Sequence, residues 1–326
     1  MKNRFFLGID TSAYTTSIAL INDNDEVLLD NREILNVKKG KKGLRQQEAI
    51  FQHMLNVPYM IENIFKKINF SYIMGVGISS KPRNVEGSYM PVFRVGEGYG
   101  KVISDTLNVP LFSFSHQDGH IAAINVDNNL SIQNDFLALH ISGGTTELLE
   151  VKNSNKGYKI NICGGTSDIS AGQLIDRIGV KLGFGFPAGR ELEYLFKDKG
   201  KVLKKVPIST KNSWINFSGP ETYFIKTIDK GDFSKEDIVR SLFYCVGKSL
   251  ANILEYKILE EKYKEILIIG GVASNNYIRQ LLKEKLSNYA DVKILFPKNE
   301  YCTDNAIGIA WLCRRSYISK EGENGL

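Results

Sequence analysis

The sequence predicts an α/β protein made of two similar lobes, and two observations carry that prediction. A strand, a polar turn and a second strand occupy residues 5–21, and the same order returns over residues 136–151. Helix-like and strand-like segments alternate along the rest of the chain, which is typical of largely parallel sheets covered by helices. The duplication predicts two lobes with a central cleft between them.

The first half of the chain continues with a helix over residues 48–67, a strand over residues 72–78 and a helix over residues 98–107. Pro58 is expected to kink the first of these helices, since proline has no N–H to donate. Helical spacing assigns the buried side of that helix to Ile50, Met54, Val57 and Ile61.

The second half continues the same alternation after its own hairpin. Apolar residues at helical spacing predict helices over residues 170–182, 234–263, 274–288 and 306–317. Short apolar runs predict strands over residues 264–270 and 292–296. Thr303 is the expected N-cap of the last helix.

The composition is that of a folded, globular protein. Of the 326 residues, 43% are apolar and 24% are charged, with 29 glycines and 8 prolines. These values exclude collagen-like, largely disordered and disulfide-scaffold proteins. The 4 cysteines form no C-x-x-C pair and are expected as reduced thiols. No apolar run approaches the roughly 18 residues that span a bilayer, so we expect no membrane partner and a cytoplasmic location.

Positive charge is concentrated in a few segments. The 42 Lys and Arg residues against 36 Asp and Glu residues give a net charge of +6, which permits a polyanionic partner without requiring one. One cluster covers residues 38–45, a second covers residues 197–205, and a third is Lys81-Pro82-Arg83. Each is either a solvated loop or part of a surface that binds a polyanion such as tRNA.

Three turns of small residues follow predicted strands, at residues 10–16, 142–146 and 270–276. Such turns expose several backbone N–H groups, which can hold a phosphate. Glycine in a turn also serves simply to permit a positive φ, so one such turn is weak support for a ligand. Three in one chain, two of them in matching hairpins, favour nucleotide binding.

His116 and His120 are four residues apart, which puts both imidazoles on one face of a helix, within reach of a single metal ion. Chance also produces this spacing, although the chain has only 4 histidines. His140 at a predicted strand end and Asp304 before the last helix could complete an N/O site suited to Fe, Zn or Mn. Gln117 stands where an H-E-x-x-H peptidase needs its glutamate base, which disfavours peptidase chemistry.

Eight short motifs stand in a fixed order along the chain. They are Gly8-Ile9-Asp10-Thr11-Ser12 with Thr16-Ser17; His116-x-x-x-His120; Ser142-Gly143-Gly144-Thr145; Ala171-Gly172-Gln173 with Asp176; Pro187-Ala188-Gly189; Phe217-Ser218-Gly219; Gly270-Gly271-Val272-Ala273 with Asn275; and Cys302-Thr303-Asp304-Asn305-Ala306. This order resembles the TsaD family, the tRNA N6-adenosine threonylcarbamoyltransferases once described as O-sialoglycoprotein endopeptidases or glycoproteases. The resemblance covers about residues 5–316, and eight ordered motifs are far more specific than any one alone.

The resemblance implies the duplicated fold of actin and the sugar kinases. It places an N-terminal actin-like lobe at residues 1–130, with the helix at residues 306–317 packing back onto it. A C-terminal actin-like lobe with a helical insert then covers residues 131–305. We expect a disordered tail at residues 318–326.

The resemblance also implies one divalent metal ion and a nucleotide, which is ATP, ADP or an adenylate. The implied metal ligands are His116, His120, His140 and Asp304, with His140 standing where some relatives carry a metal-binding tyrosine. The implied catalytic residues are Asp10 and Ser142. The implied nucleotide contacts are Thr11, Ser12, Ser142, Gly143, Gly144, Asp176, Gly189, Glu193, Gly270, Gly271 and Asn275.

The activity that the resemblance implies is metal-dependent transfer of a threonylcarbamoyl group from threonylcarbamoyl-adenylate to tRNA adenosine next to the anticodon. The implied partners are tRNA and either other proteins of the threonylcarbamoyl machinery or a second copy of the chain. Two alternatives stay open: a paralogue that carbamoylates a different acceptor, and a nucleotide-binding partner subunit without turnover. A kinase with Asp10 as its base is a further possibility for the fold.

Several positions depart from the family pattern. Ala13-Tyr14-Thr15 replaces a Cys-Asp-Glu run, Thr145 replaces His or Asn, and Gln173 replaces Glu. The paired acids ahead of Ala171 are reduced to Asp168-Ile169, and a longer, cationic segment at residues 80–90 replaces Gly-Pro-Gly. Asp10 and Asp168 are the general bases that remain. These changes suggest a divergent member or paralogue.

Overall fold

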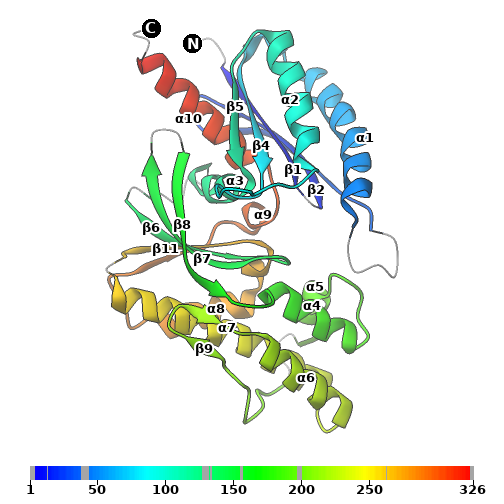
Figure 1. The fold of residues 1–326 in the computed structure, drawn as a ribbon, viewed down its shortest axis with the longest axis vertical. Coiled ribbons are helices and arrows are strands. Elements are labelled where there is room, and N and C mark those ends of the chain that lie inside the picture. Colours follow the sequence, from blue (N-terminus) through cyan, green and yellow to red (C-terminus); the bar gives the residue numbers. More distant parts are fainter. Residues whose placement is uncertain are drawn as a thin grey trace. The chain divides into compact units, whose positions relative to one another are not determined.

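The structure is a computed structural model that describes residues 4–12, 14–37, 44–126, 132, 134–154, 157–196, 200–261 and 263–323. The chain forms two compact units, and Figure 1 labels most of their helices and strands. The first comprises Met1–Gln133, Lys152–Lys159 and Thr303–Leu326, and the second comprises Asn134–Val151 and Ile160–Cys302. Residues 38–43 of the first lysine cluster and residues 197–199 of the second lie outside the described residues.

The first unit is built on a sheet of 5 strands. In spatial order they are β3 (Val27–Ile34), β2 (Thr15–Asn22), β1 (Phe5–Ser12), β4 (Ile73–Lys81) and β5 (Leu111–Ser115). β1, β2 and β3 pair antiparallel, whereas β1, β4 and β5 run parallel. The centre of this sheet is apolar on both faces, because successive residues of β1 and β2 are buried.

The second unit repeats this arrangement in a sheet of 7 strands. In spatial order they are β12 (Lys293–Leu295), β11 (Glu265–Ile269), β6 (Phe136–Ile141), β7 (Thr146–Ser154), β8 (Gly157–Thr166), β10 (Trp214–Ile215) and β9 (Thr210–Lys211). β6 pairs antiparallel with β7 and parallel with β11, which runs parallel with β12. β6, β7, β8, β11 and β12 therefore correspond to β1, β2, β3, β4 and β5, which confirms the predicted duplicated α/β fold.

Helices cover both sheets. The first unit contains α1 (Gln46–Phe65), α2 (Phe93–Leu107), α3 (His116–Ala122) and α10 (Ile307–Glu323). The second contains α4 (Ala171–Lys181), α5 (Gly189–Phe196), α6 (Ser218–Lys230), α7 (Lys235–Glu260), α8 (Asn276–Leu286) and α9 (Asn299–Cys302). Within the described ranges, no helix is long and apolar enough to cross a membrane.

Three local details differ from the sequence-based predictions. α1 buries Ala49, His53, Val57, Met60 and Ile64, whereas the predicted Met54 is 52% exposed. The apolar spacing misses this face because His53 is polar and is buried through hydrogen bonds. The side chain that accepts from the first N–H of α10 belongs to Asn305, and the Thr303 hydroxyl instead accepts from Arg32.

The third difference concerns the end of the chain. The pattern predicts a disordered tail from residue 318, but α10 continues to Glu323. The last turns have a partner, because Arg4 donates to the Glu321 carboxylate at 2.7 Å. This ion pair ties the end of α10 to the start of β1.

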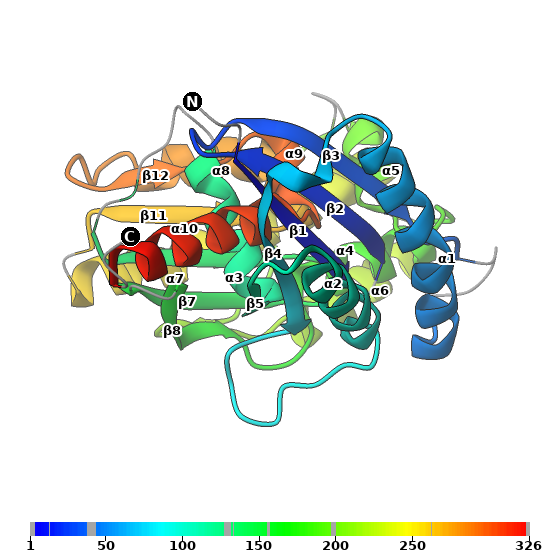
Figure 2. The ribbon, with the colours of Figure 1, turned by 90° about the horizontal axis from the view of Figure 1, so that it is seen from above.

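α10 packs against β1, β4 and α3 (Figure 2), and glycines make this close packing possible. A Cβ atom on Gly308 would overlap the carbonyl oxygen of Gly119 in α3, and one on Gly8 in β1 would overlap the carbonyl oxygen of Ala306. The absence of side chains at these positions therefore sets how closely α10 approaches α3 and the sheet.

Replacing Gly308 by Ala should lower the free energy of unfolding by about 1–3 kcal/mol, because a methyl group at a backbone contact must push α10 away from α3. The matched control is Gly98→Ala in α2, where a Cβ meets nothing within 4 Å and alanine is favoured by roughly 0.5–1 kcal/mol. Urea denaturation of both variants checks the prediction. Equal stabilities would show that α3 and α10 are not held at this distance.

Candidate functional site

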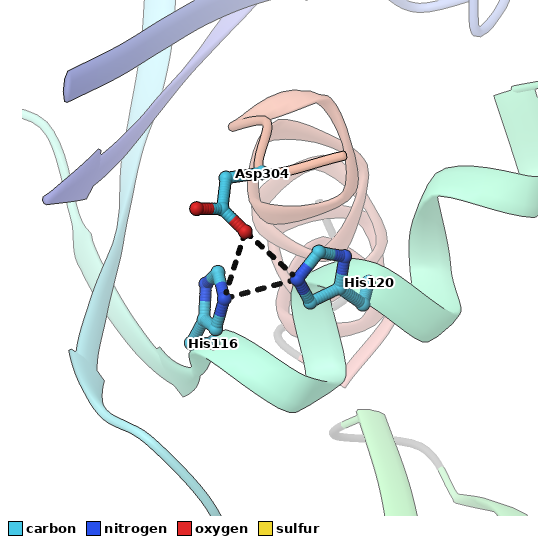
Figure 3. A group of neighbouring side chains, drawn as sticks. All are labelled: His116, His120 and Asp304. Carbon is cyan, nitrogen blue, oxygen red and sulfur yellow. Dashed lines mark hydrogen bonds and ion pairs between the residues drawn. The ribbon is translucent and has the colours of Figure 1, made fainter. Parts of the chain in front are cut away.

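Three side chains of the first unit converge on one point (Figure 3). His116 and His120 come from α3, and Asp304 precedes α10. The two histidine Nε2 atoms are 2.9 Å apart, and the Asp304 Oδ1 atom lies 3.6 Å from the Nε2 of His116 and 3.4 Å from that of His120. We call these residues the His–His–Asp cluster.

The sequence around α3 explains why both histidines share one face. Ser115 and Asp118 form a capping box, in which the Ser115 hydroxyl accepts from the Asp118 N–H and the Asp118 carboxylate accepts from the Ser115 N–H. The helix therefore begins at His116, and His120 lies one turn later. Asn84 also donates to the Asp118 carboxylate, at 2.5 Å, which ties the capping box to the segment after β4.

Asp10, at the carboxyl-terminal part of β1, holds the ring of His116. The Nδ1 atom of His116 lies 2.7 Å from the Asp10 Oδ2 atom, and the Ser79 hydroxyl donates to the Asp10 Oδ1 atom at 2.5 Å. A carboxylate accepts hydrogen bonds, so the proton of the His116 ring belongs on Nδ1, and a neutral ring then presents its Nε2 lone pair to the cluster.

The centre of the cluster requires positive charge. Burial acts to lower the pKa of His116, but the charge and hydrogen bond of Asp10, together with Asp304, outweigh it and raise that pKa to about 10. Burial also lowers the pKa of His120, and the charge of His116 adds to that effect. Burial alone would raise the pKa of Asp304, but its contacts with His116 and His120 hold it well below the usual value. Without a metal, a proton on the histidines supplies this positive charge. A bound metal cation would supply it equally.

The donor set fits a divalent metal ion. The three ligand atoms all lie within 4.8 Å of one another. For bonds of about 2.0–2.2 Å, ligand atoms around one tetrahedral ion are separated by roughly 3.3–3.6 Å. The two separations from Asp304 match this range, whereas the 2.9 Å between the histidine Nε2 atoms is shorter. Two imidazoles and a carboxylate suit Fe, Zn or Mn, and Asp10 is the type of outer group that orients a ligating histidine.

The fourth predicted metal ligand, His140, lies in β6 of the second unit, opposite Glu147 of β7 and Ile269 of β11. The His–His–Asp cluster belongs entirely to the first unit. Ligation by His140 stays a prediction.

The two candidate general bases are both engaged. The oxygens of Asp10 contact His116 and Ser79. Those of Asp168 accept from the N–H groups of Phe217 and Ser218 at 2.9 and 2.8 Å. Partial burial acts to raise the pKa of Asp168, but these hydrogen bonds lower it, so Asp168 is a weak base that organises the start of α6.

Thr11 and Ser12, the predicted nucleotide contacts of the first unit, differ in their hydrogen bonding. The Thr11 hydroxyl donates to the Val92 carbonyl oxygen and accepts from the Gly96 N–H, so it joins β1 to the start of α2. The Ser12 Oγ atom is buried and has no hydrogen-bond partner among the described residues. Ser12 therefore has hydrogen-bonding capacity that no described residue uses.

In the second unit, two predicted nucleotide turns lie side by side. The Ser142 turn follows β6 and the Gly270 turn follows β11, and these neighbouring strands run parallel, so both turns extend from the same sheet edge. Gly270 has φ +97, and a Cβ there would overlap the Ile141 carbonyl oxygen. In contrast, Gly143, Gly144 and Gly271 border open space. Two glycine turns with unfilled space beside them suit a phosphate-bearing ligand.

The other predicted nucleotide residues of the second unit support nearby backbone. Asp176 accepts from the Ala188 N–H at 2.8 Å, just before Gly189, and burial raises its pKa against this hydrogen bond. Glu193 accepts from the backbone and side chain of Asn276 at 2.8 and 3.1 Å. The side chain of Asn275 accepts from the Ile278 N–H and caps α8.

Ser79, which the sequence did not indicate as a site residue, lies next to the cluster and donates a hydrogen bond to Asp10. A signal for it exists, because the otherwise apolar strand β4 ends in Ser79, Ser80 and Lys81, and β4 lies beside β1 in a parallel pair. Carboxyl ends of parallel strands meet at one sheet edge, so a polar residue at the end of β4 falls near Asp10.

Fold and site together define a duplicated α/β protein with a His–His–Asp cluster that suits a metal cation. The chain resembles component A of (R)-2-hydroxyglutaryl-CoA dehydratase from Acidaminococcus fermentans, with a TM-score of 0.56 and 15% identity over 97% of this chain and 99% of that one. It also resembles a ROK family glucokinase from Streptomyces griseus, with a TM-score of 0.52 and 11% identity over 95% and 99% of the two chains. The fold is therefore the actin-like and sugar-kinase-like one.

The sequence comparisons specify the family. The model for tRNA N6-adenosine threonylcarbamoyltransferase, TsaD, matches residues 29–311. A tRNA N6-adenosine threonylcarbamoyltransferase from Thermosipho africanus is 31% identical over 312 residues, which cover 93% of this chain and 92% of the relative. The chain belongs to the TsaD family, as its ordered motifs predict.

Replacing His116 and His120 together by Ala should abolish stoichiometric metal binding while the fold persists, because two of three ligand atoms are lost. Asp10→Asn should keep the site but weaken metal affinity by about 10–100-fold, since His116 loses its carboxylate partner. The measurement is metal titration with circular dichroism as the folding control. Full metal content in the purified double variant would contradict the assignment.

Proposed function

We propose that this chain catalyses metal-dependent transfer of a threonylcarbamoyl group from threonylcarbamoyl-adenylate to the N6 atom of a tRNA adenosine next to the anticodon. Membership of the TsaD family supports the transferase chemistry. The observation that carries the metal dependence is the His–His–Asp cluster, whose three ligand atoms lie within 4.8 Å of one another.

The proposed reaction breaks the mixed anhydride between the carbamoyl carbon and the phosphate. The adenosine N6 atom forms a bond to that carbon as the carbon–oxygen bond to phosphate breaks. AMP leaves, and the N6 proton passes to the departing phosphate or to solvent. A bound divalent ion supplies Lewis-acid polarisation of a carbamoyl or phosphate oxygen. His116, His120 and Asp304 would hold it, with His140 as a further proposed ligand.

The roles proposed for the other residues follow from their contacts. Asp10 orients His116 and keeps its Nδ1 proton in place. The N–H groups of the Ser142 turn would donate to phosphate or carbonyl oxygens, because Gly143 and Gly144 leave open space beside that turn. Ser12 would add a hydroxyl contact. Asp176, Gly189, Glu193, Gly270, Gly271 and Asn275 would shape the pocket for the adenylate.

A second acceptor class is favoured by one observation. The run Ala13-Tyr14-Thr15 carries no acid where the family pattern has two, and both oxygens of Asp10 are already engaged. Transfer to an acceptor that needs no strong base, such as a more basic amine, is therefore the second candidate. A nucleotide-binding subunit without turnover is the third.

Incubation of the purified chain with metal, threonylcarbamoyl-adenylate and unmodified tRNA should produce N6-threonylcarbamoyladenosine, and the His116→Ala/His120→Ala variant should not. Nucleoside mass spectrometry measures the product, and addition of the family's partner proteins tests whether the chain works alone. Adenylate consumption without modified tRNA would favour the second acceptor class. No consumption under either condition would leave only the partner-subunit function.

Gly144→Val should weaken ATP binding at least tenfold, or about 1.4 kcal/mol, because a branched side chain would fill the open space beside the Ser142 turn. A Cβ at this position meets no protein atom within 4 Å, so the melting temperature should not change. Calorimetric titration with ATP decides the matter. Unchanged affinity would exclude this turn as the phosphate site.

A further inference from the structure

His53 is a fully buried histidine that no step of the proposed reaction uses. It lies in α1, and both of its ring nitrogens have partners in the β1–β2 hairpin. The Nε2 atom lies 2.9 Å from the carbonyl oxygen of Ser12, and the Nδ1 atom lies 2.8 Å from the hydroxyl of Thr16. One imidazole therefore joins both strands of the hairpin, next to its turn.

The directions of these hydrogen bonds can be assigned from their partners. A carbonyl oxygen only accepts, so Nε2 carries the proton and donates to Ser12. In the neutral ring Nδ1 then accepts, and the Thr16 hydroxyl donates to it. That hydroxyl in turn accepts from the Asn56 amide at 3.1 Å. With a neutral ring, the bonds from Asn56 through Thr16 and His53 to Ser12 have one consistent arrangement.

The sequence that connects the two strands is not one that short hairpin connections prefer. Ser12 pairs with Thr15, so residues 13 and 14 alone connect the two strands. Two-residue hairpin turns strongly prefer Asn-Gly, Asp-Gly or Gly-Gly, whereas this connection is Ala13-Tyr14. Contacts from other parts of the chain therefore matter for the residues on either side of this connection. They include the His53 bonds to Ser12 and Thr16 and a hydrogen bond from the Leu35 N–H to the Tyr14 carbonyl oxygen.

This hairpin supports the proposed site at several points. Asp10 of β1 holds His116 of α3. The Ser17 hydroxyl of β2 accepts from the Ala306 N–H at 2.8 Å, two residues after Asp304. Ser12, whose carbonyl oxygen His53 binds, also carries the buried hydroxyl without a partner among the described residues.

We infer that His53 is a positioning residue for the transfer reaction, which fixes the β1–β2 turn and thereby the orientation of Ser12 toward the substrate. This inference rests on the proposed function. It assigns His53 no contact with substrate or metal, because its partners are Ser12 and Thr16.

The bond pattern is tested without any activity. The ¹⁵N chemical shifts of the His53 ring at pH 7 should be those of the neutral form with the proton on Nε2. Burial, the largest influence, lowers the pKa of His53 below its ordinary value, which agrees with a neutral ring. A neutral ring with its proton on Nδ1, or a charged ring, would contradict the hydrogen bonds assigned between His53, Ser12 and Thr16, whatever the chain catalyses.

The positioning role is tested by His53→Ala, with Val57→Ala as the matched control. Val57 is equally buried one turn further along α1, so its truncation removes packing without removing hydrogen bonds. In His53→Ala, amide exchange of the hairpin strands next to the turn should speed up at least tenfold, and kcat should fall at least tenfold. Metal content should stay stoichiometric. Val57→Ala should change neither exchange nor kcat by as much.

His53→Gln, which keeps a donor and an acceptor, should recover part of kcat. If His53→Ala does not fold, Thr16→Val removes the donor to Nδ1 at nearly constant volume and takes its place. Equal amide exchange rates in the His53→Ala and Val57→Ala variants would show that His53 does not hold the β1–β2 hairpin through its hydrogen bonds. Faster exchange with unchanged kcat would overturn the positioning role. A wild type that is inactive even with the family's partner proteins, but shows the expected exchange difference, would refute the proposed function and confine His53 to a structural role.

Discussion

The β1–β2 hairpin is the element on which the candidate site depends. From one strand, Asp10 binds His116 in α3, and from the other, Ser17 binds the backbone of Ala306 beside Asp304. The two parts of the His–His–Asp cluster, separated by most of the chain, are thus both tied to one pair of strands. Any shift of this hairpin moves the ligands relative to one another.

Electrostatics and packing act together in this arrangement. Two imidazoles and a carboxylate around one point leave a site that demands a proton or a cation, and the Asp10 carboxylate strengthens that demand. The close approach of α3 and α10 through Gly119 and Gly308 leaves no room for either helix to move closer. The cluster is therefore held by backbone contact, and its charge is set by side chains at its edge.

The two units share one topology but differ in the chemistry of their equivalent turns. Beside the turn after β1, side chains join the two strands through His53 and Thr16, whereas the turn after β6 contains glycines that leave open space. In the first unit the ends of β1 and β4 supply Asp10 and Ser79. In the second, the ends of β6 and β11 supply the Ser142 and Gly270 turns. Duplication thus supplied one scaffold with two kinds of loop chemistry.

The sequence by itself determined the duplicated α/β fold, the family and the shared helix face of His116 and His120, because these follow from local periodicity and from ordered motifs. That Asp304 meets the two histidines was implied only by the family resemblance, because residue spacing carries no information on contacts between elements far apart in the chain. For the same reason, the sequence did not show that Ser79 supports Asp10. The sequence also did not predict which face of α1 is buried. His53 is polar, and only its hydrogen bonds to the β1–β2 hairpin make its burial favourable.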